Sequence, residues 1–326
     1  MDRFQKEFFT NNRIRLASAV SNAFIVISGH VALQYSADEP YFFRQESNFW
    51  YLTGINEPDM VLAINSVSGE HVMYVLDQND YQRDWDGARD LTEVSRKSGV
   101  SAIKPRSELI SDVAGAQKAG LGIATLPGHD ERIEPYGFYA NPGRKILENE
   151  LKTIVQNLQY IPMELAKLRQ IKQPLEIEAI RSAVGVTEKS LIDLKKRINT
   201  FTNEQEIATN LQISFLLHGG SGQKFDPIVA SGKNAATIHY KNNDNDIEKN
   251  SVLLFDVGAS VGMYGADISR VYAVGKPNQR KRDIYAALLE VHHRLLDDVK
   301  PGVSFKGMQE KANKLLGEQC KKLRIK

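Results

Sequence analysis

The stretch LLFDVGASVGMYGADISR, residues 253–270, places one aspartate in each of two apolar runs that a glycine-bearing segment separates. Short apolar runs joined by turn residues predict two antiparallel strands of a hairpin. Ten residues separate Asp256 from Asp267. Without a bulge, an even number of intervening residues allows two positions to sit directly opposite each other on one face. We therefore predict that the carboxyl groups of Asp256 and Asp267 face each other across the hairpin.

Two like charges in this position repel, and the apolar flanks predict burial, where an unpaired carboxylate is costly. A hard divalent cation takes oxygen ligands, and two such ions can share a bridging carboxylate. The alternative is an ordinary aspartate near a turn, with Arg270 neutralising one acid. Arg270 follows Asp267 by three positions, however, so in a regular strand it points to the opposite face. The spacing permits a shared metal ion without requiring one.

A histidine precedes the hairpin. FDPIVASG (225–232) predicts a strand, and ATIHY (236–240) predicts a second strand-like piece that carries His239. A lone histidine is more often structural or solvated than catalytic. One strand away from a carboxylate pair, however, His239 could donate a hydrogen bond to a reacting carbonyl or carry a proton to a leaving amine.

The chain divides into two predicted domains, 1–165 and 166–326, with the change of character near residues 161–174. The first half carries short apolar runs that predict strands, with helix candidates between them. We therefore predict a small α/β domain. Those runs are AFIVISG (23–29), NFWYLTG (48–54), MVLAINSVSGE (60–70) and HVMYVLD (71–77). In the second half, apolar residues at helical spacing predict helices over 177–194 and 284–295, with another between Asn203 and Gly219.

Composition excludes several classes of protein. The 326 residues include 42 basic and 40 acidic side chains, and neither sign forms long blocks, so we expect neither a nucleic-acid partner nor a membrane-surface partner. The N-terminal MDRFQKEFF lacks the apolar core of a signal peptide, and no stretch approaches the ~18 apolar residues of a membrane span. A single cysteine, Cys320, rules out an internal disulfide framework. We expect a cytoplasmic protein.

IVASGKNAATIHY (228–240), followed by LLFDVGASVGMYGADISRVYAVG (253–275), resembles the Xaa-Pro aminopeptidases. These belong to the pita-bread metallopeptidase family, which also holds prolidase and methionine aminopeptidase. FRQESNFWYLTGINEPDMVLAI (43–64) is similar to the signature of the aminopeptidase P N-terminal domain. The resemblance implies an α/β (α+β) fold: a small α/β N-terminal domain, then a creatinase/aminopeptidase-like pita-bread catalytic domain that is truncated here.

The resemblance also implies a reaction, the metal-dependent release of the N-terminal residue from peptides with proline in second position. In the family two divalent ions, often manganese, hold a bridging hydroxide that attacks the scissile carbonyl. Matched by motif, Asp256 would chelate one ion and Asp267 would bridge both. His239 matches the family histidine that contacts substrate and stabilises the tetrahedral intermediate. The implied partners are this peptide and, if the enzyme is complete, further copies of the chain in a dimer or tetramer.

One residue of the first domain is a further candidate. RDWDGAR (83–89) resembles the tryptophan-containing loop that, in oligomeric members of the family, reaches toward a neighbouring subunit's active site. That resemblance would give Trp85 a substrate-binding role. The alternative, which we prefer, is an ordinary aromatic residue packed at the domain surface.

The chain departs from the family pattern after Asp267. The family's dinuclear site takes five ligands, and the later histidine and two glutamates are missing here. Substitutes are disfavoured because they fall on predicted helices, whereas the family takes its ligands from the sheet. These disfavoured substitutes are His292, His293, Glu310 and Glu318. We therefore expect either a fragment of a longer enzyme or a shortened gene product, with no or very weak hydrolysis by this chain.

Three alternative functions stay open. A non-catalytic pita-bread remnant could hold peptides or protein partners, as histone-chaperone relatives of the fold do. A prolidase-like dipeptidase would share the metal site and differ in the length of its substrate. Creatine amidinohydrolase shares the fold without a metal, and the aspartate pair argues against it.

Overall fold

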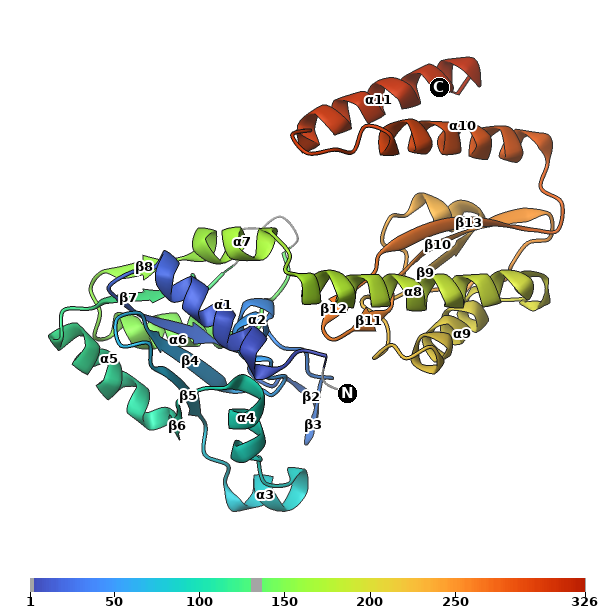
Figure 1. Cartoon of the computed structure of the whole chain (residues 1–326). Helices are drawn as coiled ribbons and strands as arrows, with labels where there is room; N and C mark the ends of the chain where they lie inside the picture. The colour runs from blue at the N-terminus through green and yellow to red at the C-terminus, as the bar shows by residue number, and fades with distance from the viewer. Residues whose placement is uncertain (1–2, 130–136, 326) are drawn as a thin grey trace. The chain divides into compact units, whose positions relative to one another are not determined.

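The computed structural model describes residues 3–129 and 137–325, which form two compact units, Met1–Leu175 and Glu176–Lys326. The first unit is built on a six-stranded mixed sheet of order β6-β5-β4-β1-β7-β8 (Figure 1). Its strands are β1 (Ala23–Ser28), β4 (Met60–Asn65), β5 (His71–Val75), β6 (Ala102–Pro105), β7 (Gly122–Thr125) and β8 (Leu158–Tyr160). Strand β4 is antiparallel to both of its neighbours, and the remaining pairs are parallel. A separate small hairpin comprises β2 (Gln34–Ser36) and β3 (Glu39–Pro40).

Helices cover both faces of this sheet. Apolar side chains of α5 and α6 share one core cluster with alternate residues of the strands, and α1, α2, α4 and α7 lie on the other side (Figure 1). Strand β1 is therefore buried at all six positions. The helices are α1 (Lys6–Ala19), α2 (Ser47–Thr53), α3 (Asp80–Asp86), α4 (Leu91–Ser98), the 3₁₀ turn η1 (Arg106–Glu108), α5 (Leu109–Lys118), α6 (Gly143–Lys152) and α7 (Pro162–Gln170).

Three of the four strands predicted in this half are confirmed, as β1, β4 and β5, but residues 48–54 form helix α2 instead. The side chain of Glu46 accepts a hydrogen bond from Phe49 N at 2.7 Å, and Gly54 ends the helix in the left-handed conformation with φ 73°. All five residues from Phe49 to Thr53 are buried. A short, wholly buried helix has no apolar stripe, so its sequence looks like that of a buried strand.

Arg13 of α1 joins the ends of two helices. Its guanidinium donates to Leu52 O at 2.7 Å in the last turn of α2, and to Gly99 O at 2.9 Å just beyond α4. Helix C-termini carry partial negative charge and unpaired carbonyls, so they stabilise a cation. Burial lowers the pKa of Arg13 to about 10, which leaves the side chain charged at neutral pH. A buried cation thus fixes three helices on one face of the sheet.

The second unit packs two helices against one face of a three-stranded antiparallel sheet of order β13-β10-β9. Strand β10 alternates between buried positions, which face the helices, and half-buried positions, which include Asp256. The sheet strands are β9 (Ile228–Ser231), β10 (Ser251–Val257) and β13 (Ile268–Val274), and a short hairpin comprises β11 (Ser260–Val261) and β12 (Tyr264–Gly265). The helices are α8 (Pro174–Lys196), η3 (Ile198–Thr200), α9 (Glu204–Leu217), η4 (Gly232–Ala236), α10 (Gln279–Leu296) and α11 (Phe305–Lys322).

The three helices predicted in this half are confirmed as α8, α9 and α10. Helix α8 begins at Pro174, whose fixed φ suits a first helical position. Among the described residues, no helix has the length and apolar character needed to cross a membrane.

We predict that Arg13→Met lowers the free energy of unfolding of the first unit by about 3 kcal/mol, because the buried Leu52 carbonyl and the half-buried Gly99 carbonyl lose a charged donor. Both tryptophans, Trp50 and Trp85, lie in this unit, so tryptophan emission during urea unfolding of the full chain reports on it alone. Arg15→Met is the matched control on the same helix. Within the described residues Arg15 makes long contacts only, of 3.4 and 3.5 Å, so its loss should remain below about 1 kcal/mol. Equal losses in the two variants would contradict the role of Arg13.

Candidate functional site

A two-residue turn sets the register of the hairpin that carries the two aspartates. Gly262 and Met263 form this turn, both with positive φ, of 54° and 66°. On either side of it, Val261 pairs with Tyr264 and Ser260 with Gly265. The same register continues in the main ladder, where Asp256 lies opposite Ser269.

The predicted antiparallel hairpin is confirmed, but direct opposition of Asp256 and Asp267 is wrong by two positions. An even spacing was a necessary condition, whereas the position of the turn decides which residues pair. Continuing the ladder by one step sets Asp267 opposite Gly258. A Cβ on Gly258 would lie 1.8 Å from Ala266 O, so this position requires glycine. Asp267 and Asp256 are thus diagonal neighbours on one face, within reach of long side chains.

The two carboxyl groups nevertheless interact. Burial raises the pKa of Asp256 above its ordinary value, and Asp267 raises it further through a side-chain hydrogen bond and like charge. The Ser269 hydroxyl and the charge of His239 lower the pKa of Asp256. The structure therefore brings Asp256, Asp267 and His239 into one electrostatic neighbourhood. An acidic pair of this kind favours a bound cation.

Helix α8 supports the segment between the two aspartates. Thr187 Oγ1 accepts a hydrogen bond from Ala259 N at 2.9 Å, and Tyr264 OH donates to Glu176 Oε1 at 2.7 Å. Thr187 and Glu176 are both buried, with 0% and 2% of their surface exposed. Neither residue can be recognised from the sequence, because within a helical pattern both look like ordinary polar positions.

His239 lies in an exposed turn, so the strand predicted for residues 236–240 is wrong. After β9 the chain enters the 3₁₀ helix η4, starting with Gly232 at φ 52°, and Thr237 N donates back to Asn234 O at 3.0 Å. Ile238 is 82% exposed. The β-branched pair Thr237–Ile238 resembles strand sequence, but it has no buried face against which to pack.

Trp85 belongs to the other unit. It lies on α3, a helix without buried residues, where it is 68% exposed and its ring centre is 5.5 Å from that of Tyr81. Its substrate-binding role stays a prediction.

The substitute ligands weighed from the sequence lie on the surfaces of α10 and α11, all of them exposed. These are His292, His293, Glu310 and Glu318. Across residues 3–129 and 137–325, no three His, Cys, Asp or Glu side chains gather as a metal site would require. The acidic pair therefore has no third ligand of these types within the described residues.

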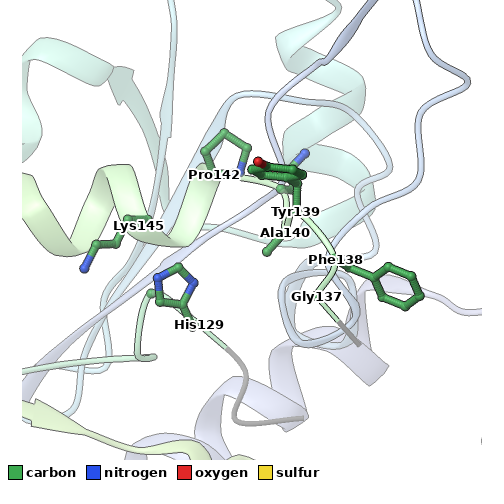
Figure 2. A pocket seen from close by; sticks show the side chains of 9 residues that line it. His129, Gly137, Phe138, Tyr139, Ala140, Pro142 and Lys145 are labelled. Carbon is green, nitrogen blue, oxygen red and sulfur yellow. The ribbon is translucent and has the colours of Figure 1, made fainter. Parts of the chain in front are cut away.

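A cavity of about 410 Å³ in the first unit is a separate feature, lined by residues 128–129, 137–142 and Lys145. Figure 2 shows His129 and Lys145 turned to one side of it, while Phe138 points away. The lining residues that are described offer no carboxylate. Residues 130–136, which follow the lining residue His129 in the sequence, lie outside the described part of the chain, so we assign no function to this cavity.

Two family models match the chain one after the other. The model of the aminopeptidase P N-terminal domain matches residues 9–120, and the model of metallopeptidase family M24 matches residues 178–324. The chain belongs to the aminopeptidase P family. The predicted order of a small α/β domain followed by a partial pita-bread domain is thereby confirmed.

Curated relatives of this family member are longer than it is. The chain is 27% identical to the Xaa-Pro aminopeptidase of Haemophilus influenzae over 94% of its own length and 70% of the relative's. It is 26% identical to mouse Xaa-Pro aminopeptidase 3, over 92% of its own length and 60% of the relative's. A fungal relative, PEPP from Coccidioides posadasii, is 28% identical, and the chain spans 59% of its length.

Solved structures share the fold, among them one of aminopeptidase P. The low-pH form of the Escherichia coli enzyme superposes with a TM-score of 0.84 at 23% identity, over 98% of this chain and 74% of the other. Icp55 from Saccharomyces cerevisiae gives a TM-score of 0.81 at 24% identity, over 97% of this chain and 73% of Icp55. At these identities the likeness is one of fold.

We predict that Asp267→Asn makes β10 and β13 open less readily in the metal-free chain, because it removes one of two like charges in contact. Amide hydrogen exchange at pH 8, above the range in which model carboxyl groups titrate, should slow by about two- to tenfold in peptides that span these strands. Asp283→Asn in α10 is the matched control and should leave these peptides unchanged. Faster or unaltered exchange in Asp267→Asn would count against repulsion within the pair.

Proposed function

We propose that this chain carries the N-terminal domain, residues 1–165, and the first part of the catalytic domain, residues 166–326, of an Xaa-Pro aminopeptidase. The observation that carries the proposal is the acidic pair Asp256–Asp267 with His239 beside it, in a chain of the aminopeptidase P family. The reaction is release of the N-terminal residue from peptides with proline in second position. Relatives named for this reaction support the assignment.

Asp256 and Asp267 are the residues that would hold divalent metal. Both offer oxygen ligands, which suit hard divalent ions such as manganese, and a cation relieves the repulsion between two carboxylates in contact. By motif, Asp256 would be a ligand of one ion and Asp267 would be a ligand shared by the pair. A bound metal pair supplies Lewis acidity and an activated water to peptide hydrolysis.

His239 is the residue that would contact substrate. Its ring is exposed and near Asp256, so it can donate a hydrogen bond to the oxygen of the scissile carbonyl as negative charge develops there. Trp85 is a second, separate candidate for substrate contact, since its ring is exposed on α3.

The substrate class rests on the relatives. One solved Escherichia coli aminopeptidase P structure holds the inhibitor Pro-Leu, and this chain covers 74% of that protein. We propose a peptide substrate, assembly into a dimer or tetramer by the complete enzyme, and a cytoplasmic location.

A second candidate function is peptide binding without hydrolysis. It is favoured by the lack of a third metal-binding side chain near Asp256 and Asp267 among the described residues. Two carboxylates hold a hydrated ion weakly, and a metal pair needs further ligands. In this second candidate function, the chain binds the same peptides but does not hydrolyse them.

We predict no or very weak hydrolysis of an Xaa-Pro peptide by the 326-residue chain with added Mn²⁺, because three of the five family ligands are missing from its sequence. Release of the N-terminal amino acid would be followed by chromatography. Robust manganese-dependent turnover by the pure chain would overturn this prediction and would require ligands that we have not identified.

We predict weak Mn²⁺ binding to the acidic pair. Titration calorimetry should show binding at least about tenfold weaker in Asp256→Asn and Asp267→Asn, since even outer-shell changes cost 10- to 100-fold in metal affinity. Asp283→Asn, which replaces an aspartate of α10, should bind as the unmodified chain does. Equal affinity in all four proteins would refute the assignment of the metal ligands.

A further inference from the structure

The loop that carries His239 covers the free edge of the β13-β10-β9 sheet. Among the strands of the described residues, β9 pairs with β10 alone, and on its other side the amides of Val229 and Ser231 point outward. Unpaired amides at a sheet edge need acceptors or attract other strands. Residues 232–246 leave β9, pass through His239 and return beside the start of α9, where Asn203 bridges to Asp246.

Glu204 fastens both ends of this loop. Its side chain is fully buried at the first position of α9. At the outgoing end, Oε1 accepts from both the amide and the hydroxyl of Ser231, each at 2.7 Å. At the returning end, Oε2 accepts from Tyr240 OH at 2.7 Å and from Asn245 N at 3.2 Å. Four donors and the positive end of a helix thus surround one buried carboxylate.

Tyr240 connects His239 to the buried carboxylate of Glu204. The two residues are adjacent, so their Cα atoms are about 3.8 Å apart. The Tyr240 hydroxyl lies 2.7 Å from Glu204 Oε2 and 2.9 Å from Asp244 Oδ1. Burial and the hydrogen bond to Glu204 raise the pKa of Tyr240, so the phenol keeps its proton. The backbone at His239 is therefore tied to a buried point of α9.

Asn243 provides a second, independent anchor. It is buried, with φ 49°, and its Oδ1 accepts from Val229 N at 2.9 Å while Nδ2 donates to Pro227 O at 2.9 Å. Asn243 therefore closes the part of the β9 edge that Glu204 does not reach. Residues 235–239 are exposed between the end of β9 and Tyr240, so His239 lies on an exposed stretch next to the anchored Tyr240.

We propose that Glu204 is a positioning residue that holds His239 beside Asp256. This inference rests on the proposed function, in which His239 contacts substrate, and it assigns Glu204 no contact with substrate or metal. A buried carboxylate with four neutral donors is an expensive way to stabilise an edge strand, since Asn243 does so with one amide. Glu204 in addition connects β9, α9 and the residue next to His239, which are three separate elements.

Replacing Glu204 by glutamine affects the hydrogen bonds at the two ends of the loop differently. Glu204→Gln keeps an oxygen for Ser231, but its amide nitrogen cannot accept from Asn245 N or Tyr240 OH. Tyr240→Phe removes only the bond next to His239 and guards against general misfolding of the buried variant. Glu206→Gln is the matched control, because Glu206 lies two residues further along α9, is exposed, and accepts hydrogen bonds from Thr202 without contacting the loop that carries His239 in any described bond.

The test is the nuclear magnetic resonance signal of the His239 ring in the full, metal-free chain. Asp256→Asn should shift this signal, because His239 and Asp256 interact. We expect that response to be lost in Glu204→Gln and in Tyr240→Phe, and kept in Glu206→Gln. A residue that merely stabilised the fold would change the unfolding midpoint without removing the response.

Amide exchange gives the second measurement. In Glu204→Gln the Asn245 amide should exchange about tenfold faster or more, while the Val229 amide, which is held by Asn243, stays protected. Persistence of the His239 response in both variants would overturn the proposal. Because neither measurement needs metal or peptide, loss of Mn²⁺ binding would refute the proposed function and leave this result intact.

Discussion

The position of the Gly262–Met263 turn is the constraint on which the candidate site depends. A two-residue turn fixes every pair of the hairpin behind it, and here it sets Asp256 opposite Ser269. Asp267 falls opposite Gly258, where the backbone of Ala266 leaves no space for a side chain, and Asp256 lies on its diagonal. Two like charges then share one face of a small sheet. The local cost of that arrangement is the physical reason to expect a cation there.

Two helices hold the segments around this pair. Helix α8 contributes Thr187 and Glu176 to the excursion between the aspartates, and α9 contributes Glu204 to the loop that carries His239. All three side chains are buried and hydrogen-bonded, which makes their geometry costly to change. The first unit uses the same principle for stability, since Arg13 is buried against the ends of α2 and α4.

Periodicity and turn residues predicted the elements whose burial is one-sided or that are long, such as α8 and the strands β10 and β13. They failed where tertiary context overrides local preference. Residues 48–54 are aromatic-rich yet form a helix because capping at Glu46 and Gly54 and burial on all sides favour it. Residues 236–240 look like a strand yet pair with no strand of the described chain. The aspartate pair was found from spacing, whereas Glu204 could not be, because only the return of the loop shows what it holds.

Metal binding by the aspartate pair can be tested with an anomalous difference map from a crystal of the full chain soaked in Mn²⁺. We expect a manganese peak in contact with carboxylate oxygens of both Asp256 and Asp267. A map with manganese bound elsewhere on the chain, and with Asp256 and Asp267 neutralised by a basic side chain, would contradict it.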